Sequence, residues 1–120
     1  MNLIHINRKI FNALIGEERE IYVRDIVSRE VEEYNSIAKD ETIDADDISR
    51  ITKGIIRLIV SNENIIRKYG WEKYVESNYP AYADCQGYSY SSGKFGVMAF
   101  DWSAETVDEL DYSFSIFKIL

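Results

Sequence analysis

Two residue types that often carry chemistry, histidine and cysteine, occur once each in this chain. A histidine that acts as a general base needs a second group to orient it, and the sequence around His5 identifies none. A Cys–His nucleophile would require His5 and Cys85 to meet in the fold, and Asp84 beside the cysteine would raise the pKa of its thiol. We therefore expect a structural histidine, a small buried cysteine and no catalytic site.

Metal and phosphate motifs are incomplete in this sequence. One histidine and one cysteine leave a zinc site to be completed by carboxylates, and no CxxC pair occurs. A calcium loop counted from Asp40 has Ala45 where glycine is needed and Ile51 where glutamate is needed. The fragment SSGKFG lacks the spacing of a phosphate-binding loop. The sequence predicts no metal and no cofactor.

Acidic residues are crowded into two stretches. The first lies between Lys94 and Lys118, where no basic residue occurs. Such a run is mildly unfavourable for an isolated fold, and one explanation is a surface that steers a basic partner. A solvated loop with helix-capping acids is the alternative. The first stretch holds Asp101, Glu105, Asp108, Glu109 and Asp111, and the second holds Asp40, Glu41, Asp44, Asp46 and Asp47.

Aromatic residues are concentrated in the second half of the chain. Tyr88 and Tyr90 are two residues apart and so share one face of a strand. Tyrosine and tryptophan are common interface anchors, so these two and Trp102 are predicted to join the acidic residues at a partner-binding surface. Four phenylalanines are assigned to the core: Phe95, Phe100, Phe114 and Phe117.

Helical periodicity dominates the first two-thirds of the sequence. Apolar spacing predicts a helix over residues 2–15 that stops at Gly16, and another over 17–38, with a strand over 20–27 as the weaker alternative. A third helix, capped by Asp44 or Asp46, is predicted to run to Tyr69 and stop at Gly70, or to break at Ser61 and Asn62. A short helix over 71–77 ends before Tyr79-Pro80.

Strand signals follow Pro80. Residues 81–102 alternate around a Ser92-Gly93 turn and predict a hairpin. Residues 103–110 predict a short helix capped by Ser103, and 112–120 a further strand. The expected fold is a single α+β domain over residues 1–120, with about three N-terminal helices on one face of an antiparallel sheet of about three C-terminal strands.

The net charge and the cysteine count limit which partners and which cellular compartment we expect. The net charge is −7 and the pI about 4.7, so nucleic-acid backbones and anionic membranes would repel the chain, and a basic protein is the expected partner. The N-terminal residues lack a long apolar run, and one cysteine allows no internal disulfide. We expect a cytoplasmic protein.

The acidic stretches and the abundant tyrosines, without a catalytic constellation, suggest a protein-binding inhibitor. In overall character, although in no specific motif, the chain resembles bacterial immunity proteins, such as those paired with contact-dependent inhibition toxins. The resemblance implies an acidic surface that plugs the active-site cleft of a basic toxin or nuclease. Two alternatives remain open: an adaptor or assembly subunit that uses the tyrosine-rich hairpin, and a phage-encoded inhibitor of a host nuclease.

Overall fold

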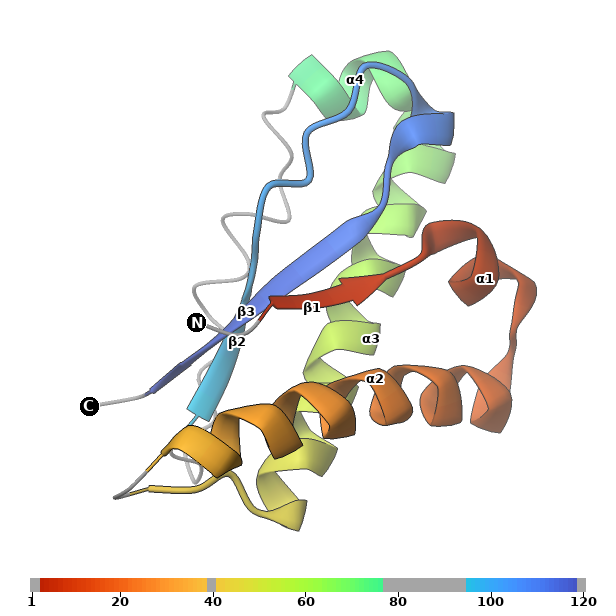
Figure 1. The fold of residues 1–120 in the computed structure, drawn as a ribbon. Helices are drawn as coiled ribbons and strands as arrows, with labels where there is room; N and C mark the ends of the chain where they lie inside the picture. The colour runs from red at the N-terminus through yellow and green to blue at the C-terminus, as the bar shows by residue number, and fades with distance from the viewer. Residues whose placement is uncertain (1–2, 39–40, 77–94, 119–120) are drawn as a thin grey trace.

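The structure is a computed structural model, and it describes residues 3–38, 41–76 and 95–118. It has an α+β arrangement of helices and a small antiparallel sheet, which confirms the predicted fold class (Figure 1). The elements are β1 (Leu3–Ile6), α1 (Arg8–Ala13), α2 (Gly16–Ile37), α3 (Ala45–Tyr69), α4 (Trp71–Glu76), β2 (Phe95–Ala99), a 3₁₀ turn (Val107–Glu109) and β3 (Tyr112–Lys118).

The sheet has the order β1-β3-β2, so the last strand lies between the first two. Antiparallel registers place Ile4 opposite Phe114, and Val97 opposite Ile116. Because side chains alternate across a strand, one face of the sheet carries these apolar residues and packs against α2 and α3. In Figure 1, α3 passes behind the sheet, and α2 runs below β1 and crosses in front of the lower part of α3.

The N-terminal segment corrects the helix predicted over residues 2–15. Residues 3–6 alternate between exposed and buried as β1, and α1 starts only after Asn7, whose side chain accepts a hydrogen bond from the backbone N–H of Ile10 (2.9 Å). The predicted stop at Gly16 is also wrong. Gly16 instead begins α2 with φ of +57°, a conformation that favours glycine.

The two long helices follow the sequence prediction closely. α2 is helical throughout, so the alternative strand over 20–27 is wrong. α3 starts after Asp44 and runs unbroken through Ser61 and Asn62 to Tyr69. Gly70, with φ of +85°, then ends it as predicted. The short helix α4 confirms the one predicted over 71–77.

The C-terminal region is partly as predicted. β2 and β3 are strands, whereas the first half of the expected hairpin, before residue 95, lies outside the described residues. The helix predicted over 103–110 is only a 3₁₀ turn, and Ser103 does not cap it; its hydroxyl donates to Asp101 Oδ1 (2.5 Å). Phe100 is 46% exposed, which contradicts its assignment to the core. Phe95 and Phe114 are buried as predicted, and Phe117 is half-buried.

The core between helices and sheet is continuous. It joins valines of α2, isoleucines of α3 and the inner face of the sheet. Trp102 is fully buried in it, with its ring edge-on to Tyr112 and Phe114 and its indole N–H donating to the carbonyl of Ser113 (2.8 Å). No helix in the described part of the chain combines the length and apolarity needed to cross a membrane.

Candidate protein-binding surface

His5 has partners that the local sequence could not identify. The β1–β3 register sets His5 opposite Ser113, so that its Nδ1 lies 3.3 Å from the Ser113 hydroxyl and its Nε2 lies 3.5 Å from Asp111 Oδ2. The imidazole is 61% exposed. A hydrolytic triad also needs a substrate cavity and donors for an oxyanion, and none of the hollows found in the described part of the chain is lined by these three residues.

Asp111 has a structural role beside His5. Its Oδ1 accepts the backbone N–H of Arg8 (2.9 Å) at the first turn of α1. The same Arg8 reaches the carbonyl of Val107 through its guanidinium (3.3 Å). Asp111 therefore joins the chain before β3 to the start of α1.

A buried polar cluster lies beneath this junction. Arg8 Nε is 2.7 Å from Glu63 Oε1, and the hydroxyl of Tyr112 donates to Glu63 Oε2 (3.0 Å) and accepts from Asn62 Nδ2 (3.0 Å). Asn12 also donates to Glu63. Burial would lower the pKa of Arg8, but the hydrogen bond and charge of Glu63 raise it above its usual value. Burial and the Glu63 charge raise the pKa of Tyr112.

This cluster connects elements that are far apart in the sequence. It ties α1, α3 and β3 together through one carboxylate, that of Glu63. The side chain of Glu63 is only 13% exposed, so the group is positioned to hold the fold together rather than to meet a ligand.

Two residues of the acidic stretch around residue 44, Asp44 and Asp47, cap α3, and Glu41 pairs with Lys118 (3.3 Å). The Asp44 side chain accepts the backbone N–H of Asp47 (2.8 Å), and Asp47 Oδ2 accepts the N–H of Asp44 (3.3 Å). The hydrogen bond from Asp47 lowers the pKa of Asp44, while burial raises the pKa of Asp47. No group of three or more metal-binding side chains occurs among the described residues. Asp40 and Cys85 lie outside them.

The acidic stretch from Asp101 to Asp111 is largely on the surface. Asp101, Glu105, Asp108 and Glu109 are exposed, and Asp111 is half-buried. The prediction that Trp102 contacts a partner is wrong for this conformation, because Trp102 is fully buried in the core. Tyr88 and Tyr90 lie outside the described residues, so their prediction stays a prediction.

The acidic stretch and α4 together form a surface that the sequence did not reveal. Trp71 donates its indole N–H to the carbonyl of Glu105 (3.3 Å), which holds α4 against the loop between β2 and β3. A groove of about 580 Å³ lies at this contact, next to a second hollow of about 350 Å³. The first is lined by Trp71, Glu72, Val75, Glu76, Ala104 and Glu105, and the second by Ser103, Ala104, Glu105 and Glu109.

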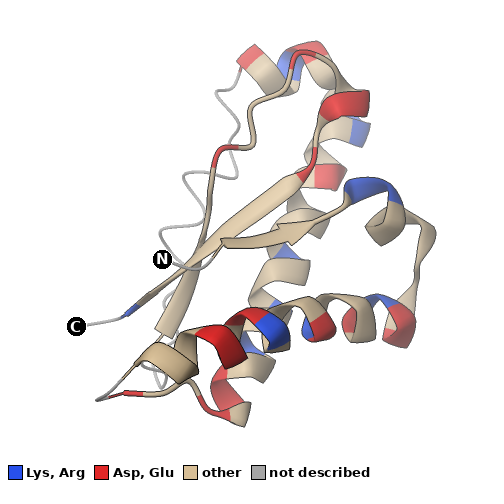
Figure 2. Ribbon diagram, viewed as in Figure 1, with Lys and Arg blue, Asp and Glu red and all other residues tan. Residues whose placement is uncertain are grey.

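Four glutamates therefore border two adjoining hollows, which we call the acidic groove. Figure 2 shows acidic residues on α4 and on the neighbouring turn before β3, at one end of the molecule. No lysine or arginine is among the residues that line the groove in the described part of the chain. Glu72 and Glu76 share one face of α4 at i, i+4 spacing, but only the tertiary contact brings them to Glu105.

Comparisons of the chain with protein-family models, curated proteins and solved structures found no match.

Proposed function

We propose that this chain is an acidic protein-binding inhibitor, of the immunity-protein type, that blocks the active-site cleft of a basic toxin or nuclease. The observation that carries the proposal is the acidic groove, whose two adjoining hollows are bordered by Glu72, Glu76, Glu105 and Glu109. Its described lining holds no cation, and the neighbouring Lys73, 3.6 Å from Glu76, offsets one of the four charges. Nucleases bind a polyanion, so their clefts are basic, and a cluster of carboxylates is complementary to such a cleft.

The groove also offers apolar contacts. Trp71 and Ala104 are half-buried, and Val75 is 36% exposed beside the glutamates. Apolar contacts of this kind contribute affinity, whereas the surrounding carboxylates accelerate the encounter and fix its register. Asp101 and Asp108, exposed on the same loop, extend the negative field that a basic partner meets. The proposed compartment is the cytoplasm, since a chain with one cysteine has no internal disulfide.

Affinity purification from the native host, at low and at high salt, tests the proposal. The tagged chain should retain a basic protein at low salt and release it as salt rises, because screening weakens contacts between exposed charges. The variant Glu105→Lys with Glu109→Lys should lose that protein. Recovery of the partner's enzymatic activity when the chain is removed by salt would identify the complex as inhibitory.

A matched control separates the groove from net charge. The variant Glu32→Lys with Glu33→Lys reverses two exposed carboxylates of α2, and it changes the net charge from −7 to −3 just as the groove variant does. It should retain the partner. Equal loss of the partner from both variants would show that only overall charge matters, and failure of the unmodified chain to retain a basic protein would refute the proposal.

A further inference from the structure

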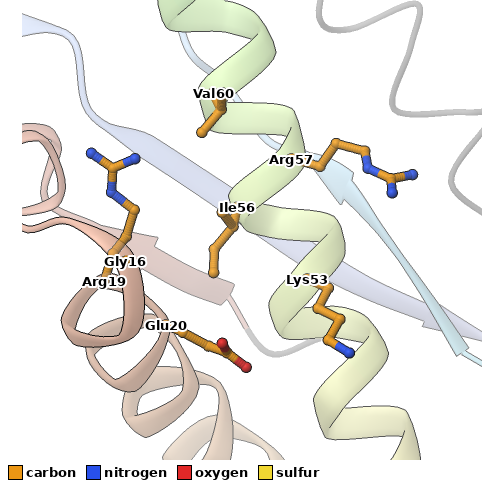
Figure 3. Close-up of a pocket in the computed structure, with 7 residues that line it drawn as sticks. All are labelled: Gly16, Arg19, Glu20, Lys53, Ile56, Arg57 and Val60. Carbon is orange, nitrogen blue, oxygen red and sulfur yellow. The ribbon is translucent and has the colours of Figure 1, made fainter.

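A second groove, lined mainly by basic residues, lies between the start of α2 and the middle of α3. Its volume is about 520 Å³. Ile56 and Val60 form its apolar floor on the side of α3 that faces α2, and Lys53 and Arg57 extend from the other side of the same helix (Figure 3). We call it the basic groove, and it shares no lining residue with the acidic groove.

Its charge is positive in a chain that is otherwise acidic. Arg19, Lys53 and Arg57 line it with one carboxylate, that of Glu20. Glu20 Oε1 already accepts a hydrogen bond from the guanidinium of Arg24 (2.8 Å), and that ion pair offsets its charge. The whole of α3 carries five basic and three acidic residues, a net charge of +2 within a chain of net charge −7.

The three cations come from both helices that border the groove. Lys53 and Arg57 are four residues apart on α3, a spacing at which like charges destabilise a helix. Arg19 is held in place, because its Nε donates to the carbonyl of Phe11 (3.2 Å) and its guanidinium lies 4.2 Å above the Phe11 ring. Arg19 on one rim, and Lys53 and Arg57 on the other, thus flank an aliphatic floor.

We propose that the basic groove binds an acidic amphipathic helix of a partner protein. An apolar stripe on that helix would contact Ile56 and Val60, whose i, i+4 spacing suits helix-in-groove packing, and carboxylates on its two flanks would meet Arg19 on one rim and Lys53 and Arg57 on the other. The shallow, open hollow encloses too little of a small molecule. The net charge of −7 disfavours a nucleic acid, which carries a far denser charge.

This inference goes beyond the proposed function, since it concerns other residues and a partner segment of opposite charge. The probe is a synthetic 16-residue helical peptide with leucines along one face and glutamates on both flanks. Titrating it into the isotopically labelled full chain, with backbone amide NMR as the readout, should give saturable shifts centred on residues 16–20 and 53–60. A peptide with glutamines in place of the glutamates should bind at least about tenfold more weakly, as expected when several charge pairs are lost.

Variants of the rim decide whether the cations recognise the peptide. Lys53→Glu with Arg57→Glu should weaken binding by at least about tenfold, and Lys53→Gln with Arg57→Gln should weaken it less, with the fold of each confirmed by its NMR spectrum. Arg29→Glu, an exposed charge reversal further along α2, should leave binding unchanged. Absence of saturable shifts at millimolar peptide, shifts centred elsewhere, or equal binding by the rim variants would overturn the inference. None of these results depends on the acidic groove.

Discussion

The sequence predicts the strand position of Tyr112, but the hydrogen-bond partners of its hydroxyl are distant in the sequence. Its alternation with Phe114 predicts a common strand face, and both are buried there. The hydrogen bonds of its hydroxyl go to Asn62 and Glu63, about fifty residues earlier. A buried tyrosine hydroxyl needs such a partner, but only the packing of α3 against β3 determines which residue supplies it.

Removing this hydroxyl should destabilise the fold. Tyr112→Phe removes the hydroxyl that bonds Glu63 Oε2 and Asn62 Nδ2, which we expect to cost about 1–3 kcal/mol at pH 7. Urea unfolding followed by circular dichroism measures it. Tyr69→Phe is the control, because Tyr69 is 57% exposed, and its effect should stay below about 0.5 kcal/mol.

The same substitution predicts a pH dependence. The folded-state pKa of Tyr112 is raised above the ordinary 10.0, so the stability that its neutral form contributes is complete below pH 10 and falls as pH rises beyond it towards the folded value. The difference between the unmodified chain and Tyr112→Phe should therefore shrink by about 1 kcal/mol from pH 7 to pH 11. An unchanged difference would contradict the assigned environment of the hydroxyl.

At the scale of elements, the start of α3 was predictable because its signal is local. An aspartate before a helical apolar pattern predicts an N-cap, and the structure selects Asp44 over Asp46. Asp44→Ala should lower the thermal midpoint by a few degrees, whereas Asp44→Asn, which caps equally well, and Asp46→Ala should change it little.

The contribution of the Asp44 cap to stability should depend on pH in the acid range. The folded-state pKa of Asp44 is lowered by the N–H of Asp47, so its contribution is present above the ordinary value of 3.8 and is lost as pH falls through the lower folded value. Relative to Asp44→Asn, the unmodified chain should lose thermal stability between pH 4 and pH 2. Parallel pH profiles of the two proteins would contradict this.

The first strand was missed because its decisive interactions are not local. Leu3, Ile6, Ile10 and Leu14 match helical spacing, but residues 3–6 pair with β3 at the other end of the sequence. Single-sequence periodicity carries no information about such a partner. The prediction therefore counted three C-terminal strands, whereas one of the three described strands comes from the N-terminus.

β1 should contribute strongly to stability despite its length. Ile4 is fully buried and Leu3 is 43% exposed, so Ile4→Ala should cost about 2–4 kcal/mol and Leu3→Ala less than about 0.5 kcal/mol. Urea titration of both variants provides the comparison. Similar losses from the two would show that β1 does not pack as described.

At the scale of the whole molecule, charge and composition predicted an acidic surface but not its shape. The run from Asp101 to Asp111 was visible as a gap in basic residues. Its partner, α4, was predicted as a helix, yet nothing local indicated that Glu72 and Glu76 would lie beside Glu105. The basic groove was equally hidden, since it combines cations from α2 and α3.

A surface kept for binding should be unfavourable for the isolated fold. The glutamates of the acidic groove repel one another, and the ion pair of Lys73 with Glu76 offsets one of their four charges. Glu105→Lys with Glu109→Lys should therefore stabilise the free chain at low salt, by up to about 1 kcal/mol. Because salt screens exposed charges, this gain should diminish at 0.5 M sodium chloride. Urea unfolding at both salt concentrations measures it. A variant that is more stable alone, yet has lost its basic partner, would show that these carboxylates serve binding rather than folding, whereas a less stable variant would assign them to the fold.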